Sequence, residues 1–313
     1  MIHVPQSKAP SSAKGRSGLT LVEVLATIFI LAIGMVSVLV LFPVGALKVR
    51  QALINERIAL AASSGESAFK ILFGTNKDAL DWRPSGGTII APLYTTLADG
   101  TSVAVIDPLA SGNTFAGSIQ TLSFTYLSGV PKYRRMFTLL DDIEWAANGS
   151  PEAAVVARGN GFSFSLFVRK TTLNAKDTFE LTTLVYHGRN LNLPNNVSEV
   201  DLTLAGAGTD FNVVNSSAIE VTVRPTLAAE DSRTLDKGGW IMDTTQVDGN
   251  ASKQQLEFYQ VQNVIDLGAG RIRLELDRPI INRFSSNAVY SIQSAKWVDR
   301  LAGVFYKGEI NLP

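Results

Sequence analysis

Apolar residues dominate one long stretch near the N-terminus. From Val24 to Leu47 the chain runs for 24 residues without a charged side chain, and Glu23 and Lys48 bound this stretch. At about 1.5 Å per residue, a helix of this length spans roughly 36 Å, which exceeds the roughly 30 Å hydrocarbon core of a bilayer. Because a secretory signal peptide has an apolar region of only about 7–15 residues, the pattern predicts a membrane-spanning helix instead.

Beyond Pro43 the apolar residues recur at intervals of three and four, which is the pattern of an amphipathic helix. They are Leu47, Ile54, Ile58, Ala61, Ala62, Ala68, Phe69 and Leu72. Gly74 follows as a typical helix stop. We therefore expect one helix over residues 19–73, whose first half lies in lipid or in a filament core and whose second half packs on a globular domain.

After about residue 75 the pattern changes to short segments that alternate or are rich in β-branched and aromatic residues, separated by Gly, Asn, Asp and Pro. These segments are 121–127, 162–168, 179–186, 218–223, 256–261, 271–276 and 288–292. The sequence thus predicts an α+β protein, in which a long N-terminal helix precedes a mainly antiparallel β head.

The length of the β-rich part suggests two portions. We expect a first β-rich head over residues 74–200 and a second β-rich subdomain, or an extension of the head, over residues 201–313. Within the second portion, four segments are expected to form a small sheet or barrel-like module: 238–243, the strand containing Phe258 and Tyr259, 271–276, and a return through 288–292.

Charge is distributed unevenly along a chain that is neutral overall. Residues 1–18 hold Lys8, Lys14 and Arg16 and no acid, which leaves 25 of the 28 basic side chains against 28 acidic ones. The positive-inside rule places this basic segment in the cytoplasm and everything after the apolar stretch on the other side of the membrane. Because the remainder is mildly acidic, no nucleic-acid partner is expected.

Glu23 stands directly before the uncharged stretch. Burying a carboxylate near the centre of a bilayer costs on the order of 2.5–3.5 kcal/mol or more, so a plain membrane anchor has no use for it. One simple role remains open: a negative charge in the first turn of a helix is favourable by roughly 0.3–1 kcal/mol. The residues around Glu23 indicate a second role.

The segment Gly18-Leu19-Thr20-Leu21-Val22-Glu23 resembles the processing and methylation motif of type IV pilins and type II secretion pseudopilins. The resemblance implies a leader peptide over residues 1–18, which a prepilin peptidase cuts between Gly18 and Leu19. It also implies N-methylation of Leu19, where phenylalanine is usual in the family. Glu23 then becomes the fifth residue of the mature chain, where the family keeps a glutamate.

In such a filament the helices bundle away from lipid, and a carboxylate at low dielectric is stabilised most by a cationic group beside it. We expect Glu23 to pair with the amine of Leu19 in an adjacent subunit and so to set the axial register. Gly34 and Pro43 interrupt the apolar stretch, and proline removes a backbone donor. A kink or a locally unwound segment is therefore expected between residues 34 and 43.

Catalytic chemistry finds little support in the composition. The chain has no cysteine and only two histidines, one of which, His3, lies in the leader. This excludes thiolate nucleophiles, cysteine-based metal sites and disulfides. No nucleophile–base set and no phosphate-binding loop is present, so we expect no catalytic residues, no enzyme activity and no cofactor.

No metal site is expected either. Asp243, Asp248 and Asn250 offer the oxygen ligands that calcium prefers. Their spacing does not match an EF-hand loop, and the sequence Asp-Gly-Asn is typical of a hairpin turn.

The sequence therefore predicts a structural subunit of a type IV pilus-like or type II secretion pseudopilus filament. Expected partners are other pilin or pseudopilin subunits, a prepilin peptidase, an inner-membrane assembly platform and the lipid bilayer, with a secreted protein or surface ligand at the head. The location expected is the bacterial inner membrane in a single pass, followed by the filament. Two alternatives remain: a minor pilin that acts as an adhesin or in DNA uptake, and a membrane-tethered enzyme.

Overall fold

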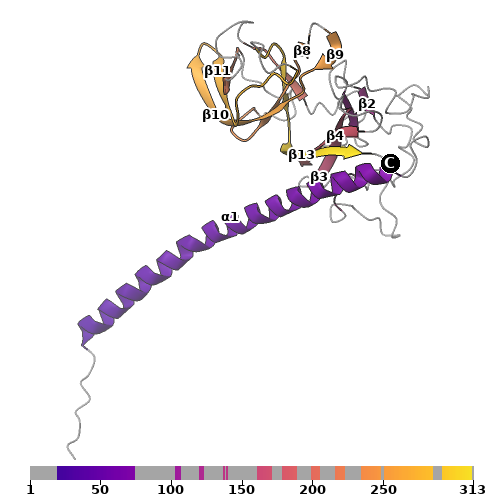
Figure 1. The fold of residues 1–313 in the computed structure, drawn as a ribbon. Coiled ribbons are helices and arrows are strands. Elements are labelled where there is room, and N and C mark those ends of the chain that lie inside the picture. Colours follow the sequence, from indigo (N-terminus) through magenta and orange to yellow (C-terminus); the bar gives the residue numbers. More distant parts are fainter. Residues whose placement is uncertain are drawn as a thin grey trace, which may run out of the picture. The chain divides into compact units, whose positions relative to one another are not determined.

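The fold is a long helix followed by β-sheets (Figure 1). The computed structural model describes residues 20–74, 103–106, 120–122, 137, 139, 161–170, 178–188, 199–204, 216–222, 234–247, 250–284 and 291–311. In these residues one helix precedes thirteen strands, and all strand pairs except one are antiparallel. The predicted α+β class is confirmed. The chain divides into two compact units, residues 1–55 and residues 56–313.

Helix α1 (Leu21–Gly74) is 54 residues long and close in extent to the helix expected over residues 19–73. It continues through Gly34 and Pro43 as regular helix, so the described chain has no unwound segment there. A kink at these residues stays a prediction. The helix ends at Gly74, where the sequence predicted a stop.

The C-terminal part of α1 packs against the β-sheet of the same unit. One face of it is buried and follows the predicted spacing of three and four residues; it comprises Ala61, Ala62, Gly65, Ala68 and Phe69. Phe69 is fully buried and meets the ring of Phe179 edge-on, with 6.3 Å between ring centroids. A Cβ atom at Gly65 would lie 2.4 Å from Oγ1 of Thr183, so glycine permits the close approach of helix and sheet.

The sheet beneath this part of α1 has five strands in the order β13-β4-β3-β1-β2. Its strands are β1 (Val103–Ile106), β2 (Gln120–Leu122), β3 (Phe162–Lys170), β4 (Thr178–His187) and β13 (Leu301–Asn311). β3 and β4 form a regular antiparallel pair from Phe162 opposite His187 to Lys170 opposite Phe179. β1 and β2 are the parallel pair.

β13 brings the end of the chain back to this first sheet, where it pairs with β4. The alternation of polar and apolar residues did not predict it. The register of β13 against β4 shifts twice, once between Leu301 and Gly303 and again between Tyr306 and Gly308. Each irregularity resets the period of two by which a strand is recognised in sequence.

A second sheet has six strands in the order β5-β12-β7-β10-β11-β6. They are β5 (Glu199–Leu202), β6 (Ala218–Val221), β7 (Trp240–Asp243), β10 (Phe258–Gly268), β11 (Arg271–Leu276) and β12 (Ala295–Val298). The outermost strands meet, because Leu204 bridges Val221 and the Thr222 N–H donates to the Thr203 carbonyl at 2.8 Å. The sheet therefore closes on itself as a small barrel, a closure that removes exposed strand edges.

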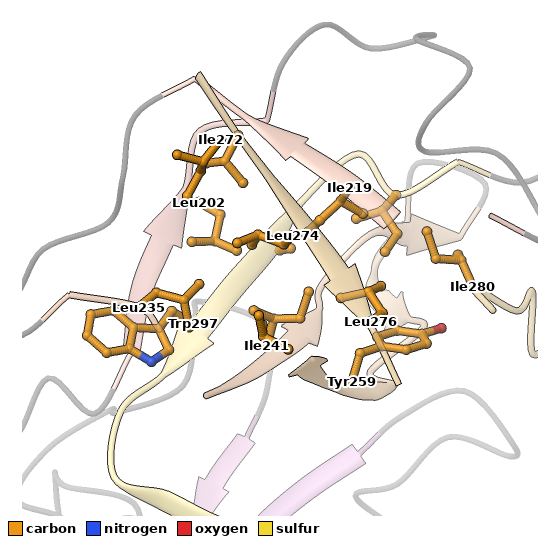
Figure 2. Packing of buried hydrophobic residues seen from close by; sticks show 14 residues of the cluster. Leu202, Ile219, Leu235, Ile241, Tyr259, Ile272, Leu274, Leu276, Ile280 and Trp297 are labelled. Atoms are coloured by element: carbon orange, nitrogen blue, oxygen red, sulfur yellow. The ribbon is translucent and has the colours of Figure 1, made fainter. Parts of the chain in front are cut away.

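The barrel interior is apolar. Figure 2 shows Ile241 and Leu276 beside Tyr259 and Leu274 in the same cluster, with side chains converging from neighbouring strands. The Tyr259 hydroxyl accepts a hydrogen bond from the backbone N–H of Ile281 at 3.2 Å, so its one polar atom is satisfied. A short hairpin of β8 (Gln246–Val247) and β9 (Asn250–Gln254) stands beside the barrel as a separate two-stranded sheet.

Most of the strands expected from sequence are present. The segments 162–168, 179–186, 218–223, 256–261 and 271–276 correspond to β3, β4, β6, β10 and β11. Segment 121–127 overlaps β2, and its residues beyond 122 lie outside the described part. The barrel-like module is confirmed in β7, β10 and β11, but the strand that pairs with β7 is β12. The expected return through 288–292 lies mostly outside the described residues, and Ile292 is in no strand.

The two sheets pack on each other through a shared apolar cluster. Phe167 of the first sheet meets Phe258 of the second edge-on, with ring centroids 5.4 Å apart. Leu184 and Tyr186 of β4 belong to the same cluster as Met242 of β7. The two predicted portions, residues 74–200 and 201–313, stay a prediction as domains.

Thr183 gives a test of how tightly this unit is packed. The side chain is fully buried, and its hydroxyl has no hydrogen-bond partner in the part of the chain that the structure describes. Replacing an unsatisfied buried hydroxyl by a methyl group of the same shape removes a desolvation cost. We expect Thr183→Val to raise the free energy of unfolding by about 1 kcal/mol, measured by urea denaturation of the full chain in detergent.

Thr245 is the matched control, because it is equally buried but its hydroxyl accepts hydrogen bonds from the N–H groups of Gln293 and Ser294. Thr245→Val is expected to change stability in the opposite direction. Two variants that destabilise the chain alike would contradict the packing seen at Thr183.

Candidate functional site

The N-terminus of α1 is fixed by Thr20. Its backbone carbonyl accepts hydrogen bonds from the N–H groups of Glu23 and Val24, and its hydroxyl accepts one from the Glu23 N–H at 3.3 Å. This is the geometry of an N-cap residue, which satisfies backbone donors that the helix itself leaves without acceptors. The pair Thr20 and Glu23 has the spacing of a capping box. The cap by Thr20 was not predicted from the sequence, although the spacing Thr-x-x-Glu is a signal that could have revealed it.

Glu23 lies in the first turn of α1 and is exposed. Among the described side chains none forms an ion pair with its carboxylate. A negative charge here interacts favourably with the positive end of the helix dipole. Thr20 supplies the cap, so the carboxylate itself remains available to another molecule.

The apolar half of α1 is exposed on every side within its own unit. All residues from Thr20 to Leu53 are exposed, and they include large apolar side chains such as Phe29, Leu31, Leu39 and Phe42. A water-soluble monomer rarely exposes a contiguous apolar patch of more than a few hundred square ångströms. By length and composition this helix is able to cross a membrane, and it is the one such helix in the described part of the chain.

Polar groups inside the apolar stretch are satisfied locally. The Thr27 hydroxyl donates to the Glu23 carbonyl at 2.7 Å, and the Ser37 hydroxyl donates to the Ile33 carbonyl at 2.9 Å. Such bonds to the preceding turn let hydroxyl side chains face an apolar medium without an unsatisfied donor. A Cβ atom at Gly34 would meet no heavy atom within 4 Å.

The remaining predicted site residues divide into those inside and those outside the described part. Gly18 and Leu19 lie outside it. Asp243 lies in β7 and is fully buried, and its carboxylate accepts a hydrogen bond from the Thr245 N–H at 2.9 Å. Asp248 lies outside, and Asn250 begins β9. The described residues contain no group of three His, Cys, Asp or Glu side chains able to hold a metal ion.

A second polar site lies between the two sheets and was not predicted from sequence. Arg283 donates to Glu257 at 2.5 Å and also to Glu180, and Arg278 donates to Glu257 at 2.9 Å. Arg169 lies beside this network in β3. Some of these residues are more than a hundred positions apart in the sequence, for example Arg283 and Glu180. No local spacing therefore reveals that they meet.

Comparison with known protein families bears on the N-terminus alone. Residues 13–39 match the family described as the prokaryotic N-terminal methylation motif. No curated protein and no solved structure matches the chain. The matched segment contains the expected cleavage site, Thr20, Glu23 and the first part of the apolar helix. The chain thus carries a prepilin-type leader of the kind found in type IV pilin and pseudopilin precursors, as its sequence predicted.

Proposed function

We propose that this protein is a structural subunit of a type IV pilus-like or type II secretion pseudopilus filament. The observation that carries the proposal is the joint presence of the methylation motif and an apolar helix exposed on every side, whose N-terminal turn holds one acid without an ion-pair partner among the described residues. Lipid covers such a surface before assembly, and the same surfaces of neighbouring subunits cover it in a filament.

The assembly step follows from electrostatics. A carboxylate moved from the membrane surface into a bundle of apolar helices needs a cationic partner, because desolvation of an unpaired charge costs several kcal/mol. Cleavage before Leu19 creates such a cation, a new amino terminus four residues from Glu23. Since the two groups are only four positions apart in the chain, pairing between subunits fixes how far one helix is displaced along the next.

The proposed partners and location follow from this scheme. A prepilin peptidase removes residues 1–18 on the cytoplasmic side, an inner-membrane platform extracts the subunit, and the β-rich head stands outside the cytoplasm. The head contacts other subunits, a secreted protein or a surface ligand. In this proposal the protein assembles and binds but does not catalyse a reaction.

The mature N-terminus provides the test. We expect intact-mass and peptide mass spectrometry of the protein from cells with a prepilin peptidase to find a chain that begins at Leu19 and carries one methyl group on its amine. In the variant Gly18→Val the peptidase no longer meets glycine at the cut, and the chain should retain all 18 leader residues. Gly15→Val is the matched control, because it changes a glycine of the same leader away from the cut.

Full processing of Gly18→Val, or a native chain that keeps its leader beside an active peptidase, would refute the proposal. Incorporation into filaments is a separate measurement, made by cross-linking of the mature chain to other subunits.

A further inference from the structure

Arg169 is a buried cation with unused hydrogen-bonding capacity. Arg169 is 4% exposed. One terminal nitrogen of its guanidinium, Nη2, donates a hydrogen bond to the Gln255 carbonyl at 2.8 Å. Its other two nitrogens, Nε and Nη1, are buried and have no hydrogen-bond acceptor among the described residues. A buried donor without a partner is destabilising, and more so when it is charged, so a folded protein rarely leaves two on one guanidinium.

The neighbouring acids do not supply the missing acceptors. Glu257 is bound by Arg278 and by Arg283, and Glu180 is bound by Arg283. The Phe284 ring lies 5.8 Å from the guanidinium carbon and stabilises the cation without accepting a conventional hydrogen bond. Burial, together with the charge of Arg283, lowers the pKa of Arg169 to about 10, so the side chain remains a cation at neutral pH.

A cavity of about 320 Å³ lies beside Arg169, between β3, β4 and β13 of the first sheet and the segment that contains β10. Among the described residues, its charged lining consists of three arginines and two glutamates, which leaves one positive charge of this set unbalanced. Its apolar lining includes Phe167, Phe258 and Val304. Tyr306, which is 61% exposed, also lines the cavity and marks the side that reaches solvent.

Backbone strain is found at the same wall. Leu256, which lies between the Gln255 carbonyl that holds Arg169 and the Glu257 carboxylate, has a φ of 53° although it is not glycine. A left-handed conformation is strained for a residue with a side chain, because its Cβ atom comes too close to the following carbonyl oxygen. Strain of this kind is characteristic of ligand sites, where the surrounding structure holds it.

We propose that this cavity binds an organic monocarboxylate, for which the Arg169 guanidinium turns its two unpaired N–H groups from the protein interior toward the cavity, with the apolar body of the ligand against Phe167, Phe258 and Val304. The unbalanced single positive charge selects a monoanion over a dianion such as phosphate. The apolar wall selects a carboxylate that carries a hydrocarbon portion. The ligand is either a free small acid or the carboxyl terminus of a polypeptide, and the site does not depend on whether the chain enters a filament.

Carbon-13 NMR of labelled butyrate with the full chain in dodecyl maltoside tests the proposal. Butyrate should bind saturably, seen as broadening of its carboxylate line, whereas uncharged butyramide should not. Inorganic phosphate should compete at least tenfold more weakly than unlabelled butyrate. Acetyl-trialanine with a free C-terminus is the second arm: tighter binding than butyrate identifies a polypeptide terminus as the source, and weaker binding identifies a free acid.

Arg169→Gln should weaken butyrate binding about tenfold or more, since it removes the charge from hydrogen bonds that the charge strengthens. Arg273→Gln is the matched control, because Arg273 is an arginine of β11 that pairs with Glu220 and lines no part of this cavity. If Arg169→Gln does not fold, Val304→Asp places a negative charge on the cavity wall and should weaken binding similarly. Equal binding of butyrate and butyramide, or unchanged binding in a folded Arg169→Gln or Val304→Asp, would overturn the proposal.

Discussion

Phe69→Ala is expected to reduce the free energy of unfolding of the β-rich unit by about 3–5 kcal/mol, the range for removing a fully buried aromatic ring. Phe69 has no exposed surface, and its ring meets Phe179 of β4 edge-on. Truncation removes both the buried area and the aromatic pair, and it leaves a cavity beneath the helix. The loss is measured by urea denaturation, monitored through the circular dichroism signal of the β-sheets.

Ile71 is the control for this experiment, because it lies two residues further along α1 and is 60% exposed. Ile71→Ala should change stability by less than about 0.5 kcal/mol, as is usual for surface substitutions. A loss below about 1 kcal/mol for Phe69→Ala would mean that the end of α1 contributes little to the core of this unit.

Sequence periodicity was sufficient for the helix and for strands with regular pairing. The helix was visible because an uncharged stretch longer than a bilayer continues directly into a pattern with spacings of three and four residues. β3 and β4 were visible because nine consecutive residue pairs keep one register, so that alternation is unbroken. These are local properties of the chain, and local properties can be read from sequence.

Long-range closure was not predictable in the same way. β13 joins β4 across more than a hundred residues, and its two register shifts disrupt the alternation that marks a strand. The closure of the barrel depends on Thr203 and Leu204 meeting Thr222 and Val221, which follows from sheet twist and connection lengths. Neither contact has a signature at fixed spacing.

The helix start at Thr20 and Glu23 and the cavity at Arg169 differ in the same way: the first can be read from local spacing, and the second cannot. Thr20 and Glu23 are three residues apart, and their spacing is itself the signal of a capped helix start. Arg169 and Glu257 are brought together only by the packing of two sheets. In the sequence, Arg169 stands at the end of an apolar alternating strand and reads as an ordinary terminal cation, so its burial was apparent only from the fold.

Glu23→Gln is expected to leave cleavage and membrane insertion intact and to reduce incorporation into filaments at least tenfold. Glutamine at this position can still serve a capping box with Thr20, so the start of α1 should be preserved. What it removes is the charge that the proposed pairing with the Leu19 amine requires. Losing one partner of a buried hydrogen-bonded charge pair costs about 2–5 kcal/mol, which is more than a factor of ten in an equilibrium.

Cross-linking and quantitative mass spectrometry of sheared filaments measure the incorporated fraction against the membrane pool. Glu56→Gln is the matched control, an exposed glutamate on the same helix beyond the apolar stretch, and should incorporate normally. Glu23→Asp retains the charge and should therefore incorporate into filaments better than Glu23→Gln. If the side chain served only as a helix cap, the charge would make no such difference. If Glu23→Gln assembles as well as the native chain, then the acid serves only the helix start, and the register between subunits must come from apolar packing.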